Sequence, residues 1–156
     1  ANGGIGAAKA AGNYSAQFYP TKLANDLGYQ QIIWTDDATH TKLEEAGTMN
    51  VFFRIGDTLL TAPTSERILD GVTRKSVLDI AKRDNITTEV RPVLVEELVA
   101  AAKNGTLKEI FGAGTAAGLF VSIFRDDISS VQAPANSKSG TKTKSILFIL
   151  IKIKND

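Results

Sequence analysis

Short apolar runs that stop at glycine or aspartate recur along this chain and restrict the folds open to it. Residues 31–35 end at Asp36, and residues 51–55 turn at Gly56 into residues 58–61. A short apolar run between turn residues is typical of a buried strand, and two runs joined by Gly-Asp predict a hairpin. We expect further strands at residues 41–46, 87–93, 107–111 and 118–124.

Apolar residues at helical spacing lie between these runs. We expect a helix from Pro20 to Leu27, because proline suits a first helical turn and Gly28 suits a left-handed cap. A second helix is expected after Gly71-Val72-Thr73 and through about Asp84, with Thr73 as its candidate cap and Val77, Leu78 and Ala81 on its inner face. A third has Leu94, Leu98 and Ala101 on its inner face and ends at Asn104-Gly105. A chain of 156 residues with these elements fits one domain.

The composition excludes several kinds of site. The sequence has no cysteine, which removes disulfides, thiolate metal ligands and cysteine nucleophiles, and fits a reducing, cytoplasmic setting. Its one histidine, His40, lies in a polar turn, so a zinc site or a serine–histidine–aspartate triad would depend on that residue alone. We therefore expect no metal site.

Charge and hydropathy exclude two kinds of partner. Residues 1–137 hold 13 basic and 16 acidic residues, a net of −3, while residues 138–156 hold five lysines and Asp156, a net of +4. The main body lacks the basic excess of a nucleic-acid-binding protein. The longest apolar run, residues 146–151, is far shorter than a membrane helix. The only methionine is Met49, so we expect a fragment of a longer protein.

Lys9 is the first candidate for chemistry. It lies in the glycine- and alanine-rich stretch of residues 3–14, and the nearest acidic residue along the chain is Asp26. An amine among groups this small and apolar titrates easily, and its free form attacks carbonyl carbons. The alternative is an exposed lysine in a glycine-rich loop, which composition alone favours. The stretch lacks the spacing and the Gly-Lys-Ser/Thr ending of a nucleotide-binding P-loop.

Glu45 is a carboxylate on the apolar face of a predicted strand. Alternation along residues 41–46 places Leu43 and Glu45 on one face, and Lys42 and Glu44 on the other. An inward carboxylate must be protonated or paired, since a bare buried charge is too costly. The alternative is that Glu45 lies at a strand end and turns outward.

Two glycine-containing turns are candidate ligand contacts. The helix start at residues 71–73 offers free backbone N–H groups to an anion such as phosphate, although most helix starts bind only water. Residues 112–118 fit the dinucleotide pattern G-x-G-x-x-A, but the strand-like segment that follows and the lack of an acidic residue at the ribose distance argue against it. This turn remains a place where bare backbone approaches a ligand closely.

Four stretches together, in this order and at these spacings, resemble the branched-chain amino acid aminotransferases, which are fold type IV pyridoxal-phosphate enzymes. The stretches are Lys9-Ala10-Ala11-Gly12-Asn13-Tyr14, Glu45-Ala46-Gly47-Thr48-Met49-Asn50-Val51-Phe52, Ile68-Leu69-Asp70-Gly71-Val72-Thr73-Arg74 and Phe111-Gly112-Ala113-Gly114-Thr115-Ala116. The resemblance covers about residues 3–127. It implies an α/β (α+β) fold, the large domain of such an enzyme, with a mixed β-sheet or pseudo-barrel and a few helices.

The resemblance also implies a cofactor, pyridoxal 5'-phosphate, and a role for each matching residue. Lys9 would form a Schiff base with the cofactor and shuttle the substrate proton, and Glu45 would pair with the pyridine nitrogen. The other implied contacts are Tyr14 with the ring hydroxyl, the backbone of Val72 and Thr73 and the hydroxyl of Thr115 with the phosphate, and Thr48 and Ala116 with the substrate carboxylate.

The implied reaction is amino-group exchange between leucine, isoleucine or valine and 2-oxoglutarate. Within the same fold, D-amino acid aminotransferases and aminodeoxychorismate lyases are alternatives, and residues 48–50 and 114–116 favour the branched-chain group. Another alternative is a non-catalytic binding or dimer-forming module. The resemblance implies a homodimer and a smaller N-terminal domain, which this chain lacks, so we expect the isolated fragment to be inactive or nearly so.

The end of the chain departs from the resemblance. We expect residues 1–127 to form the cofactor-binding domain and residues 128–156 to be a lysine-rich linker followed by a short apolar tail. Residues 146–151 are either a buried closing strand or an exposed, aggregation-prone segment.

Overall fold

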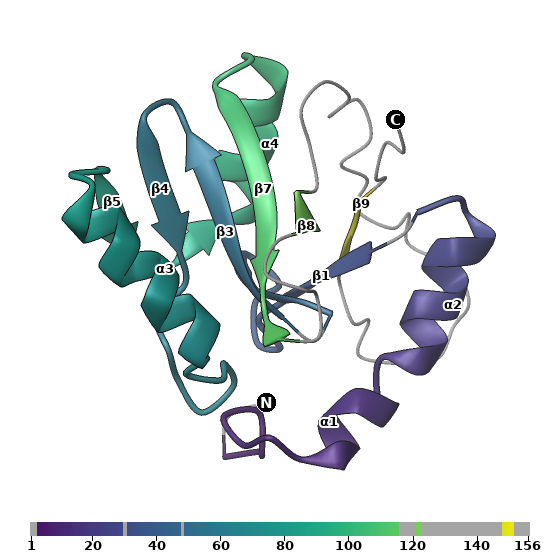
Figure 1. Cartoon of the computed structure of the whole chain (residues 1–156). Coiled ribbons are helices and arrows are strands. Elements are labelled where there is room, and N and C mark those ends of the chain that lie inside the picture. Colours follow the sequence, from purple (N-terminus) through teal and green to yellow (C-terminus); the bar gives the residue numbers. More distant parts are fainter. Residues whose placement is uncertain (1–2, 30, 48, 116–120, 123–147, 152–156) are drawn as a thin grey trace.

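The computed structural model of the chain describes residues 3–29, 31–47, 49–115, 121–122 and 148–151 (Figure 1). Its helices are α1 (Ala11–Ser15), α2 (Phe18–Asp26), α3 (Val72–Arg83) and α4 (Val95–Lys103). Its strands are β1 (Gln31–Thr35), β2 (Lys42–Ala46), β3 (Met49–Ile55), β4 (Thr58–Thr61), β5 (Thr88–Val90), β6 (Val93–Leu94), β7 (Leu107–Ala113), β8 (Val121–Ser122) and β9 (Phe148–Ile151).

The strands form one mixed sheet, which confirms the α/β class. The main path runs β5-β4-β3-β2-β1-β9, with β6 on β2, β7 on β3 and β8 on β7. The β4–β5 pair is parallel and the other pairs are antiparallel. Among the described residues this path is open, so a mixed sheet describes the fold better than a pseudo-barrel does.

Successive residues of β3 belong to two different hydrophobic clusters, because successive side chains of a strand point to opposite faces of the sheet. Phe53 belongs to a cluster that contains Leu98 and Ala101 of α4. Phe52 belongs to the other cluster, with Val77 and Ala81 of α3, and stacks on Phe111 of β7 at 5.1 Å between ring centroids. The helices α3 and α4 thus cover the two faces of the sheet around β3.

The first two helices differ from the prediction. We expected Pro20 to open a helix and residues 13–19 to link it to the lysine loop, but α2 begins at Phe18, and α1 precedes it. Pro20 is the third residue of α2, where a missing backbone N–H costs nothing because first-turn N–H groups have no partner within the helix. Gly28 adopts φ 82°, as expected for a residue that follows a helix.

The start of α3 and the strand expected at residues 87–93 also differ from the prediction. Gly71, with an extended backbone, is the N-cap of α3, and no side-chain bond caps the helix, so the prediction that Thr73 caps it was wrong. The strand expected at residues 87–93 is two strands, β5 on β4 and β6 on β2, with Arg91 and Pro92 between them. Proline has no N–H for a strand ladder, which accounts for the break.

The later part of the chain enters the sheet at two places. The strand β8 pairs with β7, and β9 pairs antiparallel with β1. Within residues 146–151, the described part is therefore a strand at the edge of the sheet. The linker expected from residue 128 to the apolar run lies outside the described residues. Among the described helices, none combines the length and the apolar character of a membrane span.

Candidate active site

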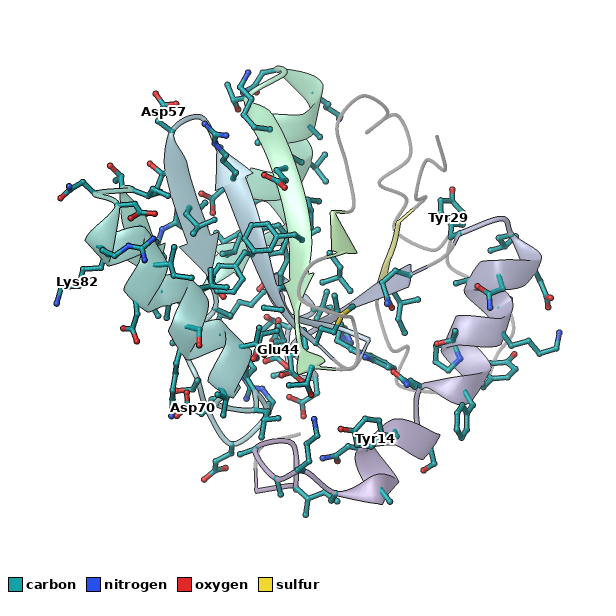
Figure 2. The ribbon with its side chains drawn as sticks, viewed as in Figure 1. Tyr14, Tyr29, Glu44, Asp57, Asp70 and Lys82 are labelled. Atoms are coloured by element: carbon teal, nitrogen blue, oxygen red, sulfur yellow. The ribbon has the colours of Figure 1, made fainter. Side chains whose placement is uncertain are left out.

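A cavity of about 620 Å³ lies where the lysine loop, residues 3–9, faces the ends of β1 and β2. Figure 2 shows Tyr14 of α1 facing the part of the sheet that carries Glu44. The side chains that line the cavity include Ile5, Lys9, Asn13, Tyr14, Trp34, Asp37, His40, Glu44, Glu45, Arg67 and Leu69. Three residues singled out from the sequence, Lys9, Tyr14 and Glu45, therefore share one cavity.

The lysine loop is held against the segment that leads to α3. The backbone N–H of Gly3 donates to the Glu66 carboxylate at 2.7 Å, and that of Ala7 donates to the Glu66 carbonyl at 2.9 Å. Gly6 lies so close to Arg67 that an added Cβ would be 2.6 Å from the Arg67 backbone oxygen. The loop can take this position only because residue 6 has no side chain.

The end of the loop is closed by Asn13, whose Nδ2 donates to the carbonyls of Ile5 at 2.8 Å and Ala8 at 2.9 Å. Lys9 is exposed, and its Nζ lies 5.9 Å from the centroid of the Tyr14 ring. That distance fits a cation–π contact, which places the amine and the phenol side by side on one wall.

Glu45 forms another wall of the cavity. Its Oε1 accepts from the Leu69 backbone N–H at 3.2 Å and from Asn50 Nδ2 at 3.1 Å. Burial raises the pKa of Glu45 to about 7; the charge of Glu44 acts in the same direction, while the Leu69 N–H and the charge of Lys9 oppose it. The carboxylate expected to lie inward is half-buried and faces this cavity.

A second carboxylate, which the sequence did not single out, lies beside Glu45. Glu44 is 9% exposed, and its Oε1 accepts from Arg67 Nε at 2.6 Å. This hydrogen bond with Glu44 is the main cause of a raised pKa for Arg67. We expected Glu44 on the face of the strand opposite Glu45, with Lys42, but Glu44 is buried and lines the same cavity as Glu45. The pairing with Arg67 explains why a charged group can be buried there. No spacing in the sequence connects residues 44 and 67.

The residues predicted to hold a phosphate lie apart from this cavity. Val72 is 76% exposed at the start of α3, Thr73 is half-buried beside it, and Thr115 is exposed just beyond β7. The cavity lining does not include these three residues. Thr48 and Ala116, the two residues predicted to face the substrate carboxylate, lie outside the described residues.

The remaining polar groups near the cavity form a structured turn. Asp36 is 2% exposed, and its carboxylate accepts from the backbone of Thr39, Thr41 and Lys42 and from the Thr39 hydroxyl. His40, in the left-handed region at φ 56°, lies with its Nδ1 3.5 Å from the Thr35 hydroxyl. Within the described ranges, no group of three or more histidine or acidic residues could hold a metal ion.

Comparison with known families finds a match over most of the chain. Residues 7–121 match the family described as amino-transferase class IV. Two curated relatives are a branched-chain-amino-acid transaminase 1 of Bacillus subtilis, 42% identical over 116 residues, and a branched-chain-amino-acid aminotransferase of Helicobacter pylori, 34% identical over 151 residues. The alignments cover 74% and 96% of this chain but 33% and 42% of these relatives, so the chain spans less than half of their length.

Solved structures give the same result for the fold. A branched-chain aminotransferase from Thermoproteus uzoniensis with norvaline is 30% identical, with a TM-score of 0.65 over 76% of this chain and 37% of its own. An aminotransferase from Brucella abortus bound to the co-factor PLP is 23% identical, with a TM-score of 0.63 over 73% of this chain and 38% of its own. The large-domain fold expected from the resemblance is confirmed.

Proposed function

Because the chain belongs to the amino-transferase class IV family, we propose that it is the cofactor-binding part of a branched-chain amino acid aminotransferase that uses pyridoxal 5'-phosphate. The substrates would be leucine, isoleucine or valine with 2-oxoglutarate, and the products the branched 2-oxo acids and glutamate. The observation that carries the proposal is the single cavity that contains Lys9, Tyr14 and Glu45, which come from three segments of the chain.

The donors and acceptors present fit this cofactor. An amine at Lys9 suits an aldehyde, a phenol at Tyr14 suits a ring hydroxyl, and a carboxylate at Glu45 suits a protonated ring nitrogen. The backbone N–H groups at the start of α3 suit a phosphate, together with the hydroxyl of Thr115. Gly71 leaves no room for a side chain there, since an added Cβ would lie 2.2 Å from Asn50 Oδ1.

Each of these residues would have its own role in the reaction. Pyridoxal phosphate, when bound, supplies an electron-withdrawing ring that stabilises negative charge on the substrate carbon. The Lys9 amine would take the proton from that carbon and pass it on to the cofactor, and the Tyr14 ring 5.9 Å away would stabilise the ammonium that results. Thr48 and Ala116 would contact the substrate carboxylate.

The environment of Glu45 suits a cationic partner. With its pKa raised to about 7 by burial, this carboxyl is neutral in a large fraction of molecules at neutral pH. A cation facing it favours the charged form, so a protonated ring nitrogen would stabilise the carboxylate while the carboxylate keeps that nitrogen protonated. The two groups would therefore hold each other in their charged forms.

The wider setting is part of the same proposal. We place the whole protein in the cytoplasm as a homodimer, with a smaller domain that completes the substrate pocket. The relatives, of which this chain spans about a third, are consistent with such an additional part.

The test is whether Lys9 binds the cofactor covalently. The chain is mixed with pyridoxal 5'-phosphate, visible absorption is recorded, and the bond is reduced with borohydride and located by mass spectrometry. We expect absorption and a modified Lys9 in the unaltered chain, no such signal for Lys9→Ala, and an unchanged signal for Lys103→Ala, an exposed lysine on α4. Equal absorption from the Lys9→Ala chain would contradict the proposal, as would no absorption from the unaltered chain.

A further inference from the structure

Asn50 lies between the two segments that carry the ends of the proposed cofactor site. It is 5% exposed, near the start of β3. In the sheet register Asn50 lies opposite Glu45 of β2 on one side and opposite Ala113 of β7 on the other. The chain continues from Ala113 to Thr115, so a single residue borders both the carboxylate end and one of the phosphate segments.

The side-chain amide of Asn50 contacts the second phosphate segment as well. Its Nδ2 donates to Glu45 Oε1 at 3.1 Å and to the Leu69 carbonyl at 2.9 Å, which uses both hydrogens of the amide. Its Oδ1 packs against Gly71, where an added Cβ would lie only 2.2 Å away. The amide thus fills the space between the Glu45 carboxylate and the turn at residues 71–73.

We propose that Asn50 is a positioning residue that fixes the Glu45 carboxylate relative to the start of α3. The inference rests on the proposed function in one respect, which is that a ligand is held at both places. Such a ligand gains from both contacts only when their separation is fixed in advance, because the second contact is then made without a further ordering cost. Loss of Asn50 should therefore weaken the binding of a ligand that makes both contacts more than the binding of a ligand that makes only one.

This expectation separates positioning from a purely structural role. If Asn50 only stabilised the fold, its removal would weaken the binding of every ligand in the cavity to the same degree and would loosen the whole sheet. Removal of a positioning residue would weaken the binding of pyridoxal 5'-phosphate more than that of pyridoxal, which has the ring and the aldehyde but no phosphate. Its removal would also loosen residues 69–73 more than the rest of the molecule.

The first experiment measures binding of both compounds. Trp34, the only tryptophan, lines the same cavity, so quenching of its fluorescence reports binding. For Asn50→Ala we expect at least a tenfold weaker affinity for pyridoxal 5'-phosphate and no more than a threefold loss for pyridoxal. Asn25→Ala, an exposed asparagine of α2, should leave both affinities unchanged. Equal losses for the two compounds, or none, overturn the proposal.

The second experiment needs no ligand. Amide hydrogen exchange of residues 69–73 should be at least tenfold faster in Asn50→Ala than in the unaltered chain, with exchange in α4 unchanged. Asn50→Asp, which keeps the size of the side chain but has no N–H to donate, should give the same local change. Unchanged exchange at residues 69–73, or equally faster exchange in α4 for both variants, overturns the proposal. If the unaltered chain binds neither compound, the proposed function fails and the exchange result alone decides the role of Asn50.

Discussion

Glu45 is a carboxyl group whose surroundings disfavour its charge, and this has a consequence for stability. Burial raises its pKa from the ordinary 4.5 to about 7. Between these two values the unfolded chain has released the proton and the folded chain still holds it. Ionisation therefore favours the unfolded state, and the contribution of Glu45 to the free energy of unfolding falls as pH rises from 4.5 to about 7, then stays constant.

The comparison of the unaltered chain with Glu45→Gln tests this consequence. Glutamine keeps the shape and an acceptor for the Leu69 N–H but does not ionise. We expect the unaltered chain to lose about 2–3 kcal/mol of unfolding free energy relative to Glu45→Gln between pH 4.5 and 7.5. Urea unfolding of both chains at several pH values measures this difference in unfolding free energy. A difference that does not change with pH, or that changes in the opposite direction, would show that folding does not raise the pKa of Glu45.

At the level of residues, the sequence singled out the cavity residues that interrupt a local pattern. Glu45 stood out because it shares a strand face with Leu43, and Lys9 because it is surrounded by glycine and alanine. Arg67 and Asn50 did not, because their roles depend on contacts with Glu44 and Leu69, which lie 23 and 19 residues away. Such pairs leave no spacing signal in one sequence.

Among the elements, the lysine loop depends on its contact with Glu66 and Arg67. At Gly6 an added Cβ would meet backbone atoms of Arg67 at 2.6–2.8 Å, and backbone cannot rotate away as a flexible side chain can. Gly12 offers a matched control within α1, since its added Cβ would find only Ile5 Cδ1 at 3.7 Å. The two glycines thus differ in the space around them.

We expect Gly6→Ala to displace the loop and to weaken binding of pyridoxal 5'-phosphate at least tenfold, with a stability loss of about 1–3 kcal/mol. Gly12 also lines the cavity, but Gly12→Ala should leave the loop in place and gain about 0.5–1 kcal/mol, because alanine favours a helix over glycine. Absorption titrations and thermal unfolding measure both effects. If Gly6→Ala behaves like Gly12→Ala, the loop is not held by its contact with Arg67.

The elements themselves were predictable where one pattern dominated. The runs at residues 31–35, 51–55 and 58–61 became β1, most of β3 and β4, because each is a short apolar segment bounded by turn residues. The helix α1, Ala-Gly-Asn-Tyr-Ser, was missed because it contains glycine and asparagine and has no buried residue to give it a pattern. Pro20 misled the boundary of α2, since proline is allowed anywhere in the first turn.

In the whole molecule, the proposed site residues lie on a surface that is partly open. Lys9, Val72 and Thr115 are all exposed, although transfer of an amino group requires a site from which water is excluded. The chain spans 33% of the length of the Bacillus subtilis relative. Transamination should therefore need more of the protein than cofactor binding does.

We expect the 156-residue chain to bind pyridoxal 5'-phosphate but to transaminate leucine with 2-oxoglutarate at least 1,000-fold more slowly than a full-length relative, since positioning and water exclusion supply several kcal/mol of the barrier reduction. Keto-acid formation from leucine measures the rate, with the Lys9→Ala chain as the background and D-alanine as the competing substrate. A rate within tenfold of the full-length relative would mean that this chain contains the complete catalytic pocket. Preference for D-alanine in the full-length protein would instead assign it to the D-amino acid aminotransferases.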